Sequence, residues 1–140
     1  MYGTLADMVG RYGLEEITAR SDRANTGELD EAIVSAVLAD ASSIADGYLR
    51  TRYSLPLMEP YPRELTSQVC AIARYLLWQD AASERVETDR DNAMAWLRDV
   101  AAGKVNLAID TPRSLARETD AMIDAPAPAV SDSDMKAFLG

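Results

Sequence analysis

The sequence of residues 30–49 is DEAIVSAVLADASSIADGYL, and this stretch decides the fold. Its apolar side chains recur every three or four residues, which is the spacing of one face of an α-helix. The residues of that stripe are Ile33, Val37, Ala41, Ile44 and Tyr48, flanked by Val34, Leu38, Ala45 and Leu49. Asp30 precedes the stripe and is a typical N-cap. The pattern predicts a long helix from Asp30 to about Thr51, with Gly47 marking close packing by a neighbour.

Two further long helices are predicted on the C-terminal side. One starts near Arg63 and runs to about Ser83, with Leu65, Val69, Ile72 and Leu76 on one face. For the other we expect Thr88 as the cap, with Asp91 at capping-box-like spacing. Its inward stripe is Ala93, Met94, Leu97, Val100 and Ala101. Gly103 is well placed to end it in a left-handed conformation.

The segments around these helices are shorter. Thr4 is expected to cap a helix from Leu5 to Tyr12, and a second short helix spans Leu14 to Arg20. Ser21 to Leu29 is polar and predicts a loop. Three prolines make Tyr53 to Pro62 an extended connector. Because this connector is rich in apolar residues, we expect it to lie across the core.

The chain changes character after Gly103. Val105, Leu107 and Ile109 alternate with other residues, which indicates a strand. A single strand cannot satisfy its own backbone groups, so the three residues are predicted to bind a partner by strand addition. The alternative is an edge segment packed on its own helices.

A tail with a Pro-Ala linker follows, and it ends in a small apolar group of residues. These residues are Met135, Phe138 and Leu139, here called the tail hook, and they are predicted to bind a partner. The alternative for the tail is disorder.

The sequence therefore predicts a mainly α protein. It is a small bundle of about three main helices plus short N-terminal helices, with one strand-like segment near 104–110 and an extended C-terminal tail. Residues 1–103 are expected to form the helical domain, and residues 104–140 the strand-like segment and docking tail.

Composition limits the function further. The formal net charge of the 140 residues is −9, which disfavours tight binding to nucleic acid. The chain shows no polybasic run, no signal peptide and no apolar run of membrane-spanning length, so no membrane is expected. Cys70 is the single cysteine, and a buried small hydrophobic residue is the favoured interpretation. We expect a soluble protein made in a reducing cytoplasm.

Catalytic chemistry is not expected either. The sequence contains no histidine and no glycine-rich phosphate loop. Its carboxylate pairs, such as Glu15 with Glu16, stand at helix starts, where acidic residues favour the helix dipole. Neither an enzyme nor a cofactor is therefore expected.

Two weaker signals favour structural interpretations. The loop from Asp22 to Asp30 resembles the start of a calcium-binding loop, but Ala24 and Ile33 stand where oxygen ligands are required. A turn followed by an N-cap is favoured.

Arginines near tyrosines, and the two tryptophans, form the second signal. Arg50, Arg52 and Arg74 near Tyr48, Tyr53 and Tyr75 are interpreted as arginine packed on tyrosine, and Trp78 and Trp96 as core residues.

Four stretches carry a resemblance to a known family. They are residues 2–8 with 21–23, residues 45–57 (ADGYLRTRYSLPL), residues 70–77 and residues 96–107. Together they resemble the small Mu-like phage and prophage proteins that are similar to head–tail connectors (adaptors) of tailed phages. The resemblance spans roughly residues 2 to 110.

The resemblance implies a homo-oligomeric ring beneath the portal protein, in the virion neck after assembly in the host cytoplasm. Such a ring extends the DNA channel, lets DNA pass without specific binding, and receives a downstream neck or tail-completion protein. The acidic charge suits such a channel. An accessory of DNA packaging, such as a small terminase-like subunit, is the alternative, and it would need a basic face that the sequence lacks.

Overall fold

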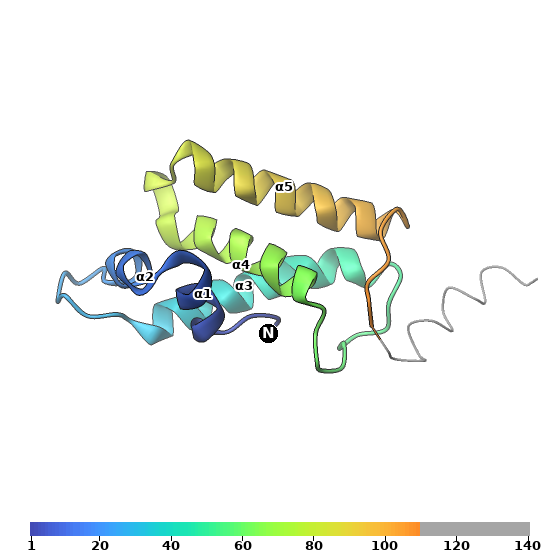
Figure 1. Cartoon of the computed structure of the whole chain (residues 1–140), viewed down its shortest axis with the longest axis horizontal. Coiled ribbons are helices and arrows are strands. Elements are labelled where there is room, and N and C mark those ends of the chain that lie inside the picture. Colours follow the sequence, from blue (N-terminus) through green and yellow to red (C-terminus); the bar gives the residue numbers. More distant parts are fainter. Residues whose placement is uncertain (110–140) are drawn as a thin grey trace, which may run out of the picture.

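The computed structural model describes residues 1–109, which form five α-helices and one 3-10 turn. The helices are α1 (Leu5–Tyr12), α2 (Leu14–Ser21), α3 (Glu31–Leu49), α4 (Arg63–Trp78) and α5 (Glu84–Ala101), with η1 (Gln79–Ala81) between the last two. Figure 1 shows α3, α4 and α5 side by side, with α4 running opposite to the other two. Helices α1 and α2 lie against one end of this bundle. The predicted mainly α fold is confirmed, and residues 1–109 contain no strand.

Side-chain caps set where several helices begin. Thr4 Oγ1 accepts a hydrogen bond from Asp7 N (3.1 Å), and Thr4 N donates to Asp7 Oδ2 (2.9 Å). This reciprocal pair satisfies two amides at the start of α1 that have no partner inside the helix. Asp30 Oδ1 accepts from the amides of Ala32 and Ile33 at the start of α3. Both predicted caps are confirmed.

The junction between α4 and α5 differs from the prediction. Helix α4 ends at Trp78 instead of Ser83, and Gln79 follows it with φ of 54°. Ser83, not Thr88, caps α5, because Ser83 Oγ accepts from Val86 N (3.3 Å). Val86 is buried and anchors the first turn of the helix, so α5 starts five residues earlier than predicted. Gly103 has φ of 84°, as the prediction required.

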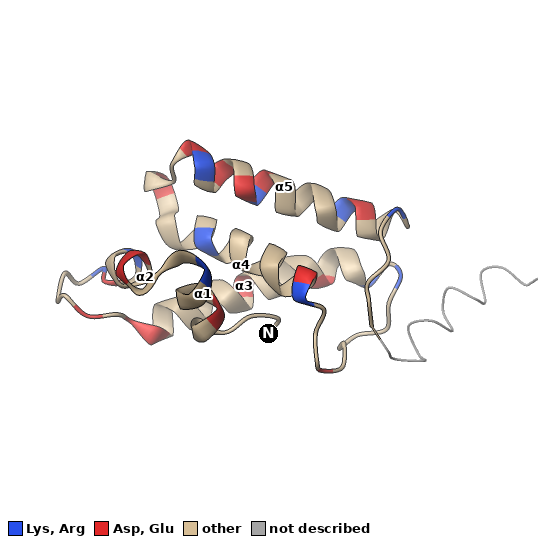
Figure 2. Ribbon diagram, in the orientation of Figure 1, with Lys and Arg blue, Asp and Glu red and all other residues tan. Residues whose placement is uncertain are grey.

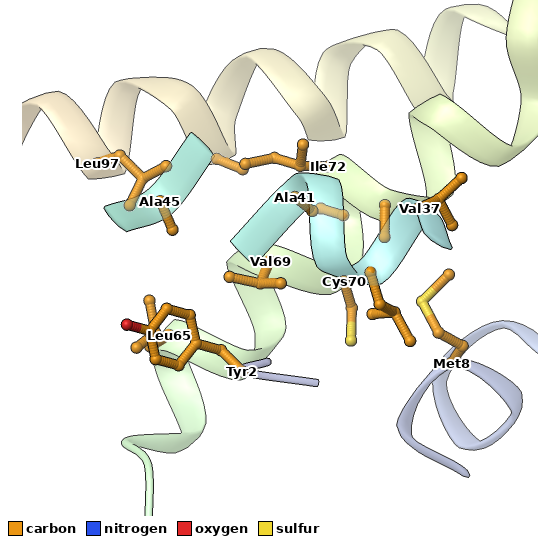
Figure 3. Packing of buried hydrophobic residues seen from close by; sticks show 14 of the residues in the cluster. Tyr2, Met8, Val37, Ala41, Ala45, Leu65, Val69, Cys70, Ile72 and Leu97 are labelled. Atoms are coloured by element: carbon orange, nitrogen blue, oxygen red, sulfur yellow. The ribbon is translucent and has the colours of Figure 1, made fainter. Parts of the chain in front are cut away.

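The core lies between α3, α4 and α5, and the N-terminal segment and α1 cover one side of it (Figure 3). Ala41, Val69 and Leu97, one from each long helix, are fully buried. Cys70 is buried among these side chains, as predicted, and burial raises its pKa to about 11. Gly3 lies so close to the core that a Cβ there would stand 3.1 Å from Cys70 Sγ. A Cβ there would require Cys70 or Leu38 to move by a few tenths of an ångström, so glycine favours this close approach to α4.

The connector between α3 and α4 lies on the core, as its composition predicts. Tyr53 and Leu57 are buried, whereas Met58 is 59% exposed.

Helix α3 is long and apolar enough to cross a membrane by length and composition, although the sequence predicts no membrane-spanning run. One side of it fills the core, yet only 39% of its most apolar window is buried. The exposed side of α3 is therefore a candidate surface for contact with a partner.

Candidate docking surfaces

The exposed side of α3 consists mainly of small residues. Its central residues, here called the α3 outer face, recur every three or four positions and are all exposed: Ala32, Ala36, Ala39, Ser43 and Gly47. Small side chains let a second helix approach closely. A Cβ placed on Gly47 would meet no atom within 4 Å. The neighbour predicted from Gly47 is therefore absent among residues 1–109 of the same chain.

The exposed side of α5 has a different chemistry. Its residues are mostly charged or polar: Glu84, Arg85, Glu87, Thr88, Asp91 and Asn92. Figure 2 shows this contrast, because α5 carries closely spaced acidic and basic residues while α3 carries few. Burying charged side chains against a partner costs free energy unless each one is paired. The α3 outer face is therefore the better docking surface of the two.

The strand-like segment packs on its own chain. Leu107 is buried, and Val105 and Ile109 are partly buried against the core. Leu107 N donates to Tyr53 Oη (3.0 Å), and Arg52 Nη1 donates to Val105 O (3.1 Å). The structure thus shows the alternative that the sequence left open, an edge segment on its own helices.

Strand addition through this segment stays a prediction, and the structure narrows how it would occur. Val105 N donates to Asp99 O, and Leu107 O accepts from Ile109 N, so these groups already have partners. The backbone groups of Asn106 and Ala108 have no partner within residues 1–109. A partner strand would therefore pair with the backbone groups of Asn106 and Ala108.

Arg52 and Tyr53 form a clamp that sequence reasoning missed. Arg52 Nη1 also donates to Val100 O (3.1 Å), at the end of α5, and Arg52 Nη2 donates to Asn106 Oδ1 (2.8 Å). The clamp therefore joins the connector to the chain that leaves α5. It thereby holds Val105, Asn106 and Leu107 on the bundle. The tail hook itself (Met135, Phe138 and Leu139) lies outside the described residues.

The loop after α2 is a turn followed by an N-cap, as predicted. Asp22 Oδ1 accepts from Thr26 N (2.7 Å), and Asp22 Oδ2 accepts from Gly27 N (2.6 Å). These backbone hydrogen bonds lower the pKa of Asp22 below its ordinary value. Its two carboxylate oxygens are occupied by the loop's own amides. Residues 1–109 hold no group of three acidic, cysteine or histidine side chains arranged for a metal ion.

Arginines pack on aromatic rings, and the partners differ in part from those expected. Arg52 lies over Tyr53, but Arg74 lies over Tyr12 (4.3 Å) instead of Tyr75. Arg90 takes the face of Tyr75 at 3.9 Å. Each contact occupies one face of a ring on which a nucleic-acid base could otherwise stack.

Glu16 is the centre of a polar cluster that joins α2 to α4. It accepts from Arg74 Nε (2.7 Å), Arg74 Nη2 (2.9 Å) and Trp78 Nε1 (2.9 Å). Burial alone would raise the pKa of Glu16, but the hydrogen bonds from Arg74 and Trp78 lower it overall. Trp78 was predicted to be a core residue, but it lies outside the core of residues 1–109, where it donates to Glu16 and has Arg20 over its ring at 3.8 Å. Trp96 packs against the core as predicted.

Comparison with known proteins identifies similar sequences along the whole chain. The family model described as Bacteriophage Mu, Gp36 matches residues 2–125. The chain is 30% identical over 140 residues to the Mu-like prophage FluMu protein gp36 of Haemophilus influenzae, with 99% of each chain covered. It is 29% identical over 141 residues to gene product J of Escherichia phage Mu, again with 99% of each covered. The similarity therefore extends beyond Asp110, where the resemblance of residues 2 to 110 ends.

Proposed function

This chain belongs to the Bacteriophage Mu Gp36 family, and from that premise we propose that it is a head–tail connector of a Mu-like phage or prophage. In this role it forms a homo-oligomeric ring under the portal protein, extends the DNA channel and receives a downstream neck or tail-completion protein. It acts in the virion neck and assembles in the host cytoplasm. Its work is structural, without catalysis and without a cofactor.

The exposure of the α3 outer face is the observation that best supports the proposed ring. A protomer in a closed ring needs two different surfaces that fit each other, because each copy contacts the next head to tail. Helix α3 is mainly apolar, yet only 39% of its most apolar window is buried in the protomer. A neighbouring protomer packed on Ala36, Ala39 and Ser43 would cover that surface at close helix–helix distance. The α3 outer face would then be one of the two surfaces.

The negative net charge of the chain supports the proposal that the ring extends a DNA channel. A net charge of −9 repels the phosphate backbone, so DNA would pass along the ring without being held. A small terminase-like subunit would instead show DNA affinity that falls steeply with salt. No observation among residues 1–109 favours that alternative.

The experiment compares two glycine substitutions in the full chain. Gly47→Leu places a large side chain on the α3 outer face, and Gly10→Leu does the same on α1. In both positions a Cβ meets no atom within 4 Å, so both variants are expected to fold. Size-exclusion chromatography with light scattering, and negative-stain images of portal particles mixed with each protein, report the assembly.

The wild-type protein and Gly10→Leu are expected to form rings alone or on the portal, and Gly47→Leu to remain a folded monomer. A wild-type protein that stays monomeric and ignores portal particles would refute the connector. If Gly47→Leu assembles like the wild-type protein, the α3 outer face is not the ring contact.

A further inference from the structure

An apolar groove lies between α3, α4 and α5 and has a volume of about 320 Å³. Ile44 of α3, Ile72 and Leu76 of α4 and Met94 of α5 line it. Ile44, Leu76 and Met94 are only partly buried, so their side chains face both the core and the groove. The groove is therefore an apolar surface that a short apolar segment would cover.

Charged residues of α5 form the rim of the groove. Arg90 is stacked on Tyr75 and lies 2.7 Å from Asp91, which holds both side chains in place. Arg98 is exposed at the rim and forms no ion pair with residues 1–109. The rim thus offers two cations and one anion around an apolar floor, which favours a ligand with apolar anchors, acidic residues and one basic residue.

The C-terminal part of the same chain has this composition. Residues 132–139 are DSDMKAFL. Met135, Phe138 and Leu139 are spaced three and four residues apart, the spacing that puts apolar side chains on one face of a helical turn. Asp132 and Asp134 are complementary in charge to the rim arginines, and Lys136 lies between the apolar anchors. We propose that the groove between α3, α4 and α5 binds the tail hook of its own chain.

The length of the tail and its attachment to the bundle favour the tail hook of the same chain, over that of a second copy, as the occupant of the groove. The Arg52–Tyr53 clamp fixes the start of the tail beside the C-terminal end of α5. Met94 stands about 10 Å from that end along the helix axis. The roughly 25 residues between Ile109 and the hook can span up to about 80 Å when extended, so the hook reaches the groove easily. A tether of this kind gives an effective concentration on the order of 1 mM, well above that of another copy at micromolar protein.

The inference does not depend on ring formation. It states what the hook contacts in the free protomer, whatever larger assembly the chain joins. A partner that takes the hook must first displace it from the groove.

Disulfide trapping in the full chain tests the contact. Met94→Cys combined with Phe138→Cys is oxidised at micromolar concentration, and the products are identified by mass spectrometry after digestion. Met58→Cys with Phe138→Cys is the matched control, because Met58 is exposed and lies outside the groove. A bond within one chain that forms about tenfold faster than in the control is expected. Bonds between chains would assign the groove to a second copy, and a rate equal to the control would refute the contact; both results overturn the proposal.

Hydrogen exchange of the unmodified protein gives a second readout. We expect amides 135–139 to exchange about tenfold more slowly than in an unstructured peptide, and Arg98→Glu to reduce that protection. Arg98 is exposed, so its substitution should leave the fold intact. Unprotected amides in the wild-type protein would overturn the proposal.

Discussion

Replacing Glu16 by alanine should destabilise the bundle by about 2 to 3 kcal/mol. Glu16 accepts three hydrogen bonds, two from the Arg74 guanidinium and one from Trp78. A hydrogen bond to a charged group contributes about 1.5 to 3 kcal/mol to stability. The sum is discounted because the side chains of Arg74 and Glu16 are 15% and 21% exposed, so water can replace part of what is lost.

The adjacent carboxylate provides the control. Glu15 stands in the same first turn of α2 and favours the helix dipole equally, but it is exposed. The difference between Glu16→Ala and Glu15→Ala therefore isolates the contacts with Arg74 and Trp78.

Urea unfolding followed by far-UV circular dichroism measures both variants. For a domain of this size the expected difference corresponds to a melting temperature lower by roughly 10 °C. A double-mutant cycle with Arg74→Ala should give a favourable coupling free energy between the two residues. If Glu16→Ala and Glu15→Ala differ by less than about 0.5 kcal/mol, the cluster does not hold α2 on α4 and the reasoning is refuted.

Three further outcomes are expected. Because the pKa of Glu16 is lowered in the folded state, its stabilisation is complete above the unfolded pKa of about 4.3 and is lost as pH falls through the folded value; acid titration should therefore destabilise the wild-type protein more steeply than Glu16→Ala, and parallel curves would contradict this. Tyr53→Phe removes the acceptor of the Leu107 amide and should cost about 1 kcal/mol with faster exchange of that amide, measured by hydrogen exchange; an unchanged rate would count against the clamp. Ser83→Ala should destabilise the protein by about 1 kcal/mol in urea unfolding and Thr88→Ala by much less, whereas the reverse order would restore the cap position predicted from the sequence.

Short-range sequence patterns predicted the structural features that depend on neighbouring residues alone. Thr4 and Asp30 each precede an apolar stripe by the spacing that a cap requires, so both helix starts followed from short-range geometry. The start of α5 was harder because Ser83 and Thr88 both satisfy the cap pattern. The burial of Val86 decided between them, and that depends on tertiary packing.

Contacts between residues distant in sequence could not be predicted in this way. The clamp joins Tyr53 to Leu107 and Arg52 to Asn106 across 54 positions each. No periodicity links those pairs. The contacts of Glu16 could not be predicted for the same reason. Its position at a helix start indicated only an effect on the helix dipole, whereas its contacts with Arg74 depend on how α2 packs on α4.

The single thiol makes this protein its own reporter of unfolding. Cys70 is fully buried and its pKa is about 11, so at neutral pH almost no thiolate meets a reagent in solution. Alkylation of Cys70 therefore requires that the bundle opens, and the rate of alkylation measures how often α4 leaves the core. A cysteine introduced on the surface would react much faster, so site-specific labels can be attached without replacing the native residue.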